Sequence, residues 1–221
     1  MKLNSYTLST YIAQMVLGIE ALHEIGIMHR DIKPANILVD KEGNLKLTDY
    51  GLSELKKNVS VQGLFSKKGS LNFMAPEIFL PSTHELSFGV DWYALGVLIF
   101  DIIKERLPID GDTPEETVYN ILHPKIVWDE PEELEDEDYC FSPELKDLVQ
   151  RLIEPDPKLR LGSKDGASEI KNHPYFTQKN PKNWAMVKNK QYYVYKPVKE
   201  FNSKKYISGN LALKNMKDFI E

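Results

Sequence analysis

The run His29-Arg30-Asp31-Ile32-Lys33-Pro34-Ala35-Asn36-Ile37-Leu38, followed further on by Asp49-Tyr50-Gly51, gathers several chemically active side chains in a short part of the chain. A carboxylate, an ammonium and an amide stand at i, i+2 and i+5. A second carboxylate follows after two strand-like runs, 37–39 and 45–47, which residues 40–44 join as a natural turn. The pattern predicts a loop and a short hairpin that hold these groups together.

These residue types are the ones that phosphoryl transfer uses. Asp31 offers a carboxylate that can orient a hydroxyl and accept its proton. Lys33 offers a positive charge near a moving phosphoryl group. Asn36 and Asp49 offer the oxygen ligands that Mg²⁺ prefers. The spacing therefore predicts a phosphotransferase site.

Composition sets broader limits on the chain. With 221 residues, it can bury one substantial core, and its net charge of -5 gives no reason to expect nucleic-acid binding. The single cysteine, Cys140, excludes an internal disulfide. Residues 1–10 are polar, and the apolar stretch 93–103 is shorter than the roughly 20 residues of a membrane span. We expect a soluble cytoplasmic or nuclear protein, neither secreted nor membrane-spanning.

Hydrophobic periodicity predicts a mainly helical chain. Apolar residues recur at helical spacing between Leu8 and Leu22, and Gly26 is expected to end that helix. The segment 90–103 is apolar nearly all round, which indicates a central buried helix. Further helices are expected at three places: 114–122, 143–153 and a short segment around 167–171. Residues 51–76 lack periodicity and are expected to form a functional loop.

The order of these motifs resembles the large lobe of the eukaryotic protein kinases. His29 to Leu38 is similar to their catalytic loop, and Lys33 fits the Ser/Thr-specific kind. The resemblance implies a mainly α (α+β) protein kinase-like fold: a large helical lobe with a short β-hairpin region around the catalytic loop, and an extended tail. It divides the chain into an incomplete kinase domain, 1–176, and a C-terminal tail, 177–221.

Several segments resemble the AGC group of Ser/Thr kinases in particular. They occur in the order expected for that group, and the last two are similar to the start of its C-terminal tail: Gly89-Val90-Asp91-Trp92, Arg160-Leu161-Gly162, His173-Pro174-Tyr175-Phe176, Trp184 and Tyr193-Val194-Tyr195-Lys196-Pro197.

The kinase resemblance assigns roles to these residues. It implies ATP and Mg²⁺ as cofactors, with Asp31, Lys33, Asn36 and Asp49 as catalytic residues. Lys33 and Asn36 would also contact the nucleotide–metal complex, and Leu38 would form the floor under the adenine. Asn36 and Asp49 would hold the metal. A protein with an acceptor Ser or Thr is the implied substrate.

Other residues are given supporting roles. Glu77, in the Ala75-Pro76-Glu77 element that closes the activation segment, is expected to pair with Arg160. Asp91, a charge at the head of an apolar helix, is expected to anchor the backbone of the catalytic loop. Tyr50 stands where Phe is commoner and is expected to pack on His29, with a partner for its hydroxyl.

Regulation is implied by Arg30, which stands beside the catalytic carboxylate. Such an arginine commonly needs a phosphate to neutralise it, and Ser66 stands where AGC-like kinases carry a phosphorylated residue. An upstream kinase acting on Ser66 is one interpretation, and an unmodified loop serine is the other. Ser70 matches a residue that contacts the catalytic loop, and Gly51 completes the metal-binding motif.

The sequence departs from a complete kinase in its first 28 residues. They contain no Gly-rich phosphate loop, no strand lysine and no helix offering a partner glutamate. We therefore expect little or no kinase activity from these 221 residues alone. A non-catalytic, kinase-derived interaction module is the alternative function. Ala35 replaces a frequent Glu, which weakens the expectation of a basic substrate.

Overall fold

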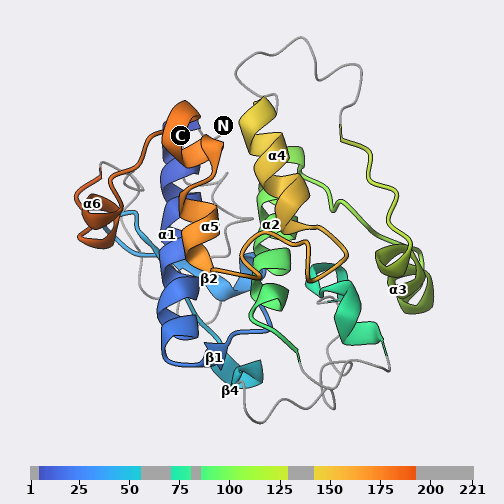
Figure 1. The fold of residues 1–221 in the computed structure, drawn as a ribbon. Coiled ribbons are helices and arrows are strands. Elements are labelled where there is room, and N and C mark those ends of the chain that lie inside the picture. The colour runs from blue at the N-terminus through green and yellow to red at the C-terminus, as the bar shows by residue number, and fades with distance from the viewer. Residues whose placement is uncertain (1–4, 56–70, 81–85, 129–141, 193–221) are drawn as a thin grey trace.

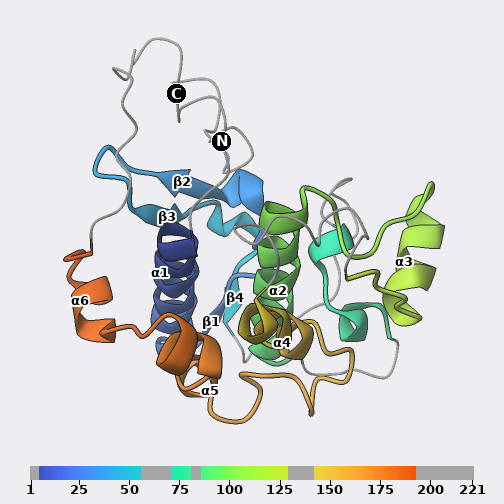
Figure 2. The same ribbon diagram turned by 90° about the horizontal axis from the view of Figure 1, so that it is seen from above.

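The chain folds into packed helices with two separate, short antiparallel strand pairs (Figures 1 and 2). The computed structural model describes residues 5–55, 71–80, 86–128 and 142–192. The helices are α1 (Ser5–Glu24), α2 (Gly89–Lys104), α3 (Pro114–Leu122), α4 (Pro143–Leu152), α5 (Ala167–Lys171) and α6 (Trp184–Lys188). The strands are β1 (Ile27–Met28), β2 (Ile37–Val39), β3 (Leu45–Leu47) and β4 (Glu54–Leu55). The mainly helical fold with a short β-hairpin that the sequence predicts is confirmed.

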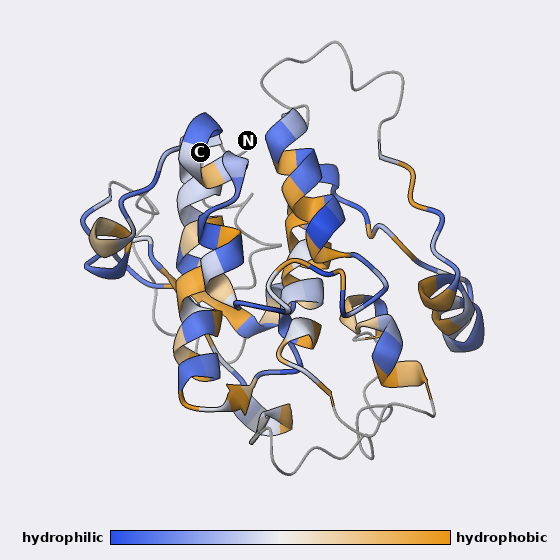
Figure 3. Ribbon diagram, viewed as in Figure 1, coloured by the Kyte–Doolittle hydropathy of each residue, from blue (hydrophilic) through white to orange (hydrophobic). Residues whose placement is uncertain are grey.

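Helix α2 lies in the centre of the fold, as its apolar sequence predicts. Every residue from Gly89 to Phe100 is buried, and α2 packs against both α1 and α4. A Cβ atom at Gly96 would come within 2.6 Å of the Ile153 side chain, so glycine permits the close approach of α2 to α4. Figure 3 shows α2 mostly hydrophobic or neutral, whereas hydrophilic and hydrophobic bands alternate along α4.

The outer helices begin and end where local chemistry predicts. Helix α3 has Thr113 as its N-cap and α4 has Ser142, each side chain accepting a backbone N–H bond, with proline at the first helical position. Helix α1 is followed by Gly26, whose φ of 79° is a conformation that glycine adopts without steric cost. The helices expected around 114–122, 143–153 and 167–171 are therefore present.

Strands β2 and β3 form the expected hairpin, which brings two distant parts of the sequence together. Ile37 pairs with Leu47 and Val39 with Leu45. The turn is closed by Asp40, whose Oδ1 accepts the backbone N–H of Asn44 at 2.8 Å. This register places the residue before β2 beside the residues after β3, which is where Asn36 and Asp49 stand.

A second strand pair is not evident from the sequence. Strand β1 pairs antiparallel with β4, with Ile27 opposite Leu55. Strands of two residues have no detectable period-2 pattern, so their pairing depends on long-range packing. The pair connects the residues that follow α1 with residues 54–55. Residues 56–70 lie outside the described residues.

The beginning of the tail packs against α1. The short helix α6 starts at the N-cap Asn183, and its Val187 side chain is buried. The sequence predicts an extended tail, so this short helix is an addition. Residues 193–221, including the Tyr193–Pro197 segment, lie outside the described part of the chain. Within the described part, no helix has the length and apolar character that crossing a bilayer requires.

Candidate active site

The backbone of the catalytic loop is held by one buried carboxylate on α2. Asp91 is fully buried, and its two oxygens accept the backbone N–H groups of His29 and Arg30, each at 2.8 Å. Arg30 has a φ of 63°, a left-handed conformation that costs a non-glycine residue of order 1–3 kcal/mol. The two hydrogen bonds to Asp91 hold this conformation. The structure therefore places the Asp91 carboxylate, in the first turn of α2, where it orders the backbone of residues 29 and 30.

A third partner of this carboxylate is not evident from the sequence. His23, in the last turn of α1, contacts Asp91 Oδ2 through Nε2 at 2.8 Å. Its ring stacks on Phe88 at 4.3 Å and meets the Trp92 ring edge-on. His23 belongs to a polar stretch at a helix end, where a histidine is ordinarily a surface residue. Only the tertiary contact between α1 and α2 gives it a role as a positioning residue.

Replacing Asp91 with Asn should loosen the loop that contains His29 and Arg30 without removing the side chains of Asp31, Lys33 or Asn36. The NH₂ group of the new amide would face the backbone N–H of either His29 or Arg30, which now donates to a carboxylate oxygen. That buried N–H would be left without an acceptor. We expect a loss of about 2 kcal/mol in unfolding free energy, within the range for an unsatisfied buried donor. Urea denaturation measures this loss. The exposed Asp112→Asn variant is the matched control, and an Asp91→Asn loss no larger than that control would contradict the anchoring role.

Asp31, Lys33 and Asn36 form one hydrogen-bonded cluster. Lys33 Nζ lies 2.8 Å from Asp31 Oδ2 and 2.9 Å from Oδ1. The Asn36 amide donates to the Asp31 carbonyl at 2.8 Å and to Oδ2 at 2.9 Å. Asp31 and Asn36 are buried, and Lys33 is partly exposed. The cluster therefore combines a desolvated carboxylate, a cation that balances it and an amide that orients it.

The hairpin places Asp49 next to a residue that contacts Asn36. Thr48, next to Asp49, donates its backbone N–H to the Asn36 carbonyl at 2.9 Å. Asp49 has a φ of 61°, and its Oδ1 accepts the Gly51 N–H at 3.2 Å. A Cβ atom at Gly51 would lie 3.1 Å from that oxygen, so a larger residue there would crowd the carboxylate. The segment after β3 thus holds Asp49 in a defined orientation.

The aromatic pair next to Asp49 is also present. The rings of His29 and Tyr50 lie 5.3 Å apart, and the Tyr50 hydroxyl donates to the Leu47 carbonyl at 3.1 Å. His29 Nε2 lies 3.2 Å from the Thr48 carbonyl. The hydroxyl that Tyr50 adds to the commoner Phe is therefore accommodated by a backbone acceptor. His29 connects the catalytic loop to the end of β3.

The donor set fits a magnesium ion that also binds phosphate. Because the Nδ2 of Asn36 is used by Asp31, its Oδ1 is the atom that can face a cation, and Asp49 supplies a carboxylate. In the described residues, no group of three or more His, Cys, Asp or Glu side chains converges on a metal position. Mg²⁺ commonly binds through one or two carboxylates with water and substrate phosphates as further ligands. Asn36 and Asp49 match that requirement.

Arg30 reaches the segment that follows Asp49. Its Nε donates to the Leu52 carbonyl at 2.8 Å, and the hydroxyl of Ser53 donates to the His29 carbonyl at 3.3 Å. The catalytic loop is therefore connected to residues 50–53 by both side chain and backbone. Ser66 and Ser70 lie outside the described residues. Leu38, in β2, is half-buried opposite Lys46.

Glu77 and Arg160 form a buried ion pair beside Gly89, the first residue of α2. Arg160 Nη1 and Nη2 donate to the two carboxylate oxygens at 2.6 and 2.8 Å. The other N–H groups of the guanidinium donate to backbone carbonyls of residues 89, 154 and 155. The guanidinium also lies over the Tyr93 ring at 5.1 Å. Burial raises the pKa of Tyr93, so its phenol stays neutral beside the pair.

This arrangement of loop, hairpin and ion pair is the architecture of a protein kinase. The family model of the protein kinase domain matches residues 1–176, and the chain belongs to the protein kinase family. The particular relatives it resembles include ribosomal protein S6 kinase 2 alpha of Gallus gallus, which is 39% identical over 168 residues, covering 76% of this chain and 21% of the relative. Ribosomal protein S6 kinase alpha-1 of Homo sapiens has the same identity and coverage.

A plant relative extends the comparison. The probable serine/threonine protein kinase IRE4 of Arabidopsis thaliana is 34% identical over 205 residues, covering 80% of this chain and 19% of the relative. The chain therefore spans about a fifth of the length of the curated relatives it matches. The resemblance to Ser/Thr kinases of the AGC group, to which the S6 kinases belong, is confirmed.

Proposed function

We propose that the chain is the substrate- and metal-binding half of an ATP-dependent protein Ser/Thr kinase. The proposal is carried by the cluster in which Asp31 is bonded to Lys33 and Asn36 while the hairpin brings Asp49 alongside. A module that serves only to bind a partner does not need these four side chains in one place. The proposed boundary between kinase lobe and tail falls after residue 176.

In this proposal, each residue has one step. A substrate Ser or Thr hydroxyl would hydrogen-bond to the Asp31 carboxylate and pass its proton there as the phosphoryl group moves. Lys33 can turn from Asp31 to the transferring phosphoryl oxygens, because the substrate hydroxyl then takes its place on the carboxylate. Bound ATP would supply the phosphoryl group and leave as ADP, and Mg²⁺ would neutralise the phosphate charge. Asn36 and Asp49 would hold that ion.

Control of the site is proposed to involve Arg30. Its position beside Asp31 favours regulation by a phosphate on the activation segment, with Ser66 as the acceptor of an upstream kinase. Leu38 is proposed to form the floor under the adenine. A protein substrate and a cytoplasmic or nuclear location complete the proposal.

The test measures phosphate transfer from Mg-ATP to peptides that carry Ser, Thr or Tyr. The 221-residue chain is compared with a fusion that joins it behind the nucleotide-binding lobe of a ribosomal protein S6 kinase. We expect the chain alone to show background transfer and the fusion to phosphorylate Ser and Thr peptides only when Mg²⁺ is present.

Two results would count against the proposal. A fusion that binds ATP but transfers no phosphate would favour the non-catalytic interaction module. Robust transfer by the 221-residue chain alone would refute the expectation that it is inactive by itself.

A further inference from the structure

The β2–β3 hairpin has the proposed metal ligands at one end and a turn at the other. Its two strands are joined by three residue pairs. At the ligand end, the Asn36 carbonyl accepts the backbone N–H of Thr48 at 2.9 Å and the Thr48 hydroxyl at 3.2 Å. A two-stranded hairpin is at best marginally stable by itself. The orientation of this one therefore depends on how it is held by the rest of the lobe.

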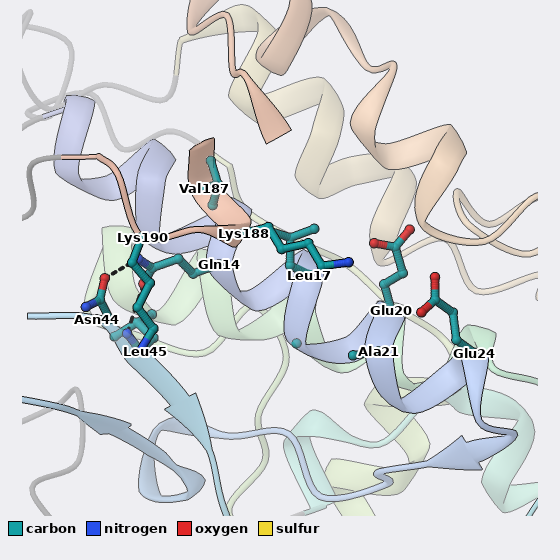
Figure 4. Close-up of a pocket in the computed structure, with 11 residues that line it drawn as sticks. Gln14, Leu17, Glu20, Ala21, Glu24, Asn44, Leu45, Val187, Lys188 and Lys190 are labelled. Carbon is teal, nitrogen blue, oxygen red and sulfur yellow. Dashed lines mark hydrogen bonds between the residues drawn. The ribbon is translucent and has the colours of Figure 1, made fainter. Parts of the chain in front are cut away.

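The side chain of Gln14 joins the turn end of the hairpin to α1. Gln14 Oε1 accepts the Leu45 backbone N–H at 2.9 Å, and Gln14 Nε2 donates to Asn44 Oδ1 at 3.0 Å. Asn44 is buried, and its own N–H donates to Asp40 Oδ1 at 2.8 Å. Figure 4 shows Gln14 beside Asn44 and Leu45. One amide group thus binds both the backbone of β3 and the residue that closes the turn.

Apolar packing also brings α1 and β3 together. A Cβ atom at Gly18, one turn after Gln14, would lie 3.2 Å from Leu47 Cδ1, so glycine lets the strand lie close to the helix. Such packing is non-directional, whereas hydrogen bonds need defined distances and angles. Gln14 therefore fixes the position of β3 along α1.

A small movement at the turn would displace the ligand end of the hairpin. Asp49 stands four residues after Leu45, at most about 13 Å along an extended chain. A tilt of about 5° over that length displaces Asp49 by about 1 Å. Mg²⁺ demands near-ideal octahedral geometry with ligand distances of about 2.0–2.1 Å. A displacement of this size would therefore weaken a metal site.

We propose that Gln14 is a positioning residue for the metal site. Through Asn44 and Leu45, it would hold the hairpin in the orientation that brings Asn36 and Asp49 to the same ion. The inference rests on the proposed function, because it takes Asn36 and Asp49 as the ligands of Mg²⁺. It adds that a side chain at the opposite end of the hairpin controls how well the ion binds.

The first test is hydrogen exchange of the full 221-residue chain, which requires neither metal nor phosphate transfer. Gln14→Met keeps the length of the side chain and removes both hydrogen bonds. In this variant the amides of Leu45 and Thr48 should exchange about tenfold faster than in the wild type, because the hairpin opens locally more often. Gln14 lines an open pocket of about 230 Å³ between α1, the hairpin turn and α6, so methionine has room there.

The second test uses the fusion of the chain with a nucleotide-binding lobe. Gln14→Met should raise about tenfold the free Mg²⁺ concentration that gives half-maximal transfer at saturating ATP. The KM for a Ser peptide should stay within about twofold of the wild-type value.

A conservative variant should rescue the metal dependence. Gln14→Glu keeps an acceptor for the Leu45 N–H, and the Asn44 amide can turn its NH₂ group toward the new carboxylate. The Mg²⁺ concentration for half-maximal transfer should therefore return to within about threefold of the wild-type value.

Two control variants on α4 separate positioning from general stability. Gln150→Met is the same substitution at an exposed helical site and should behave as the wild type does in both tests. Val149→Ala leaves a cavity at a buried site and should destabilise the lobe at least as much as Gln14→Met. Its Mg²⁺ dependence should nevertheless be that of the wild type, since Gln14 still holds the hairpin.

Three results would overturn the positioning role. The first is faster exchange at Leu45 with unchanged exchange at Thr48, which would confine the effect to the turn. The second is an unchanged Mg²⁺ dependence in an active Gln14→Met fusion, and the third is an equal change in Val149→Ala. A wild-type fusion that transfers no phosphate would instead remove the proposed function on which this inference rests, and the exchange of Thr48 is measured independently of that outcome.

Discussion

Replacing Asp31 with Asn in the active fusion is expected to lower kcat by about 10²–10⁴-fold, the usual contribution of a positioned general base. The amide cannot accept the proton of the substrate hydroxyl. It would also leave Lys33 without the carboxylate that now lies 2.8 Å away. Asn36 would keep its bond to the Asp31 backbone carbonyl, so the loop should retain its shape. Steady-state kinetics with a Ser peptide measure the change.

The division between kcat and KM separates catalysis from structure. Asp31→Asn should leave the KM for ATP nearly unchanged, since Asn36 and Asp49 are the proposed metal ligands. The exposed Asp112→Asn variant, with the same change of side chain outside the cluster, should retain wild-type kcat. A kcat for Asp31→Asn within a few-fold of wild type would remove Asp31 from its proposed role.

Replacing Arg160 with Leu is expected to lower the unfolding free energy by about 3–5 kcal/mol, the usual result of leaving a buried charge without its partner. Glu77 would be stranded at 4% exposure. The carbonyls of residues 89, 154 and 155 would lose their donors as well. Urea denaturation with far-UV circular dichroism measures the loss as a shift in the transition midpoint.

Two further variants define the cause of that loss. Arg160→Lys retains the charge but loses the planar fork that binds both Glu77 oxygens, so an intermediate loss is expected. The double variant Glu77→Met with Arg160→Leu removes both charges and should cost less than Arg160→Leu plus Glu77→Met added together. Additive losses, or a loss below about 1 kcal/mol for Arg160→Leu, would show that the pair contributes little.

The sequence predicts some elements well because their signals are local. Helices α2, α3 and α4 have the predicted positions to within a residue, since apolar periodicity and a proline at the first helical position of α3 and α4 are local signals. The hairpin follows from the turn residues 40–44 in the same way. The two-residue strands β1 and β4 and the short helix α6 carry too few residues for a periodic signal.

The candidate site likewise combines features that local sequence predicts with features that depend on tertiary packing. Resemblance in the catalytic loop identifies Asp31, Lys33, Asn36 and Asp49 as the chemical groups, and the structure brings them together through the hairpin register. No local sequence pattern predicts the contact between His23 and the Asp91 carboxylate. It follows from the packing of α1 on α2, which no short motif encodes.

By itself, the sequence determined the family and most helix positions, and it supplied the residues of the proposed chemistry, because residue types and short-range spacing control these features. The tertiary structure alone decided which distant groups share hydrogen bonds: Asp91 with residues 29 and 30, Glu77 with Arg160, and Gln14 with the hairpin turn. It also formed the pocket between α1 and α6. Such contacts join residues far apart in the chain, and their energies depend on burial and geometry that only the assembled fold provides.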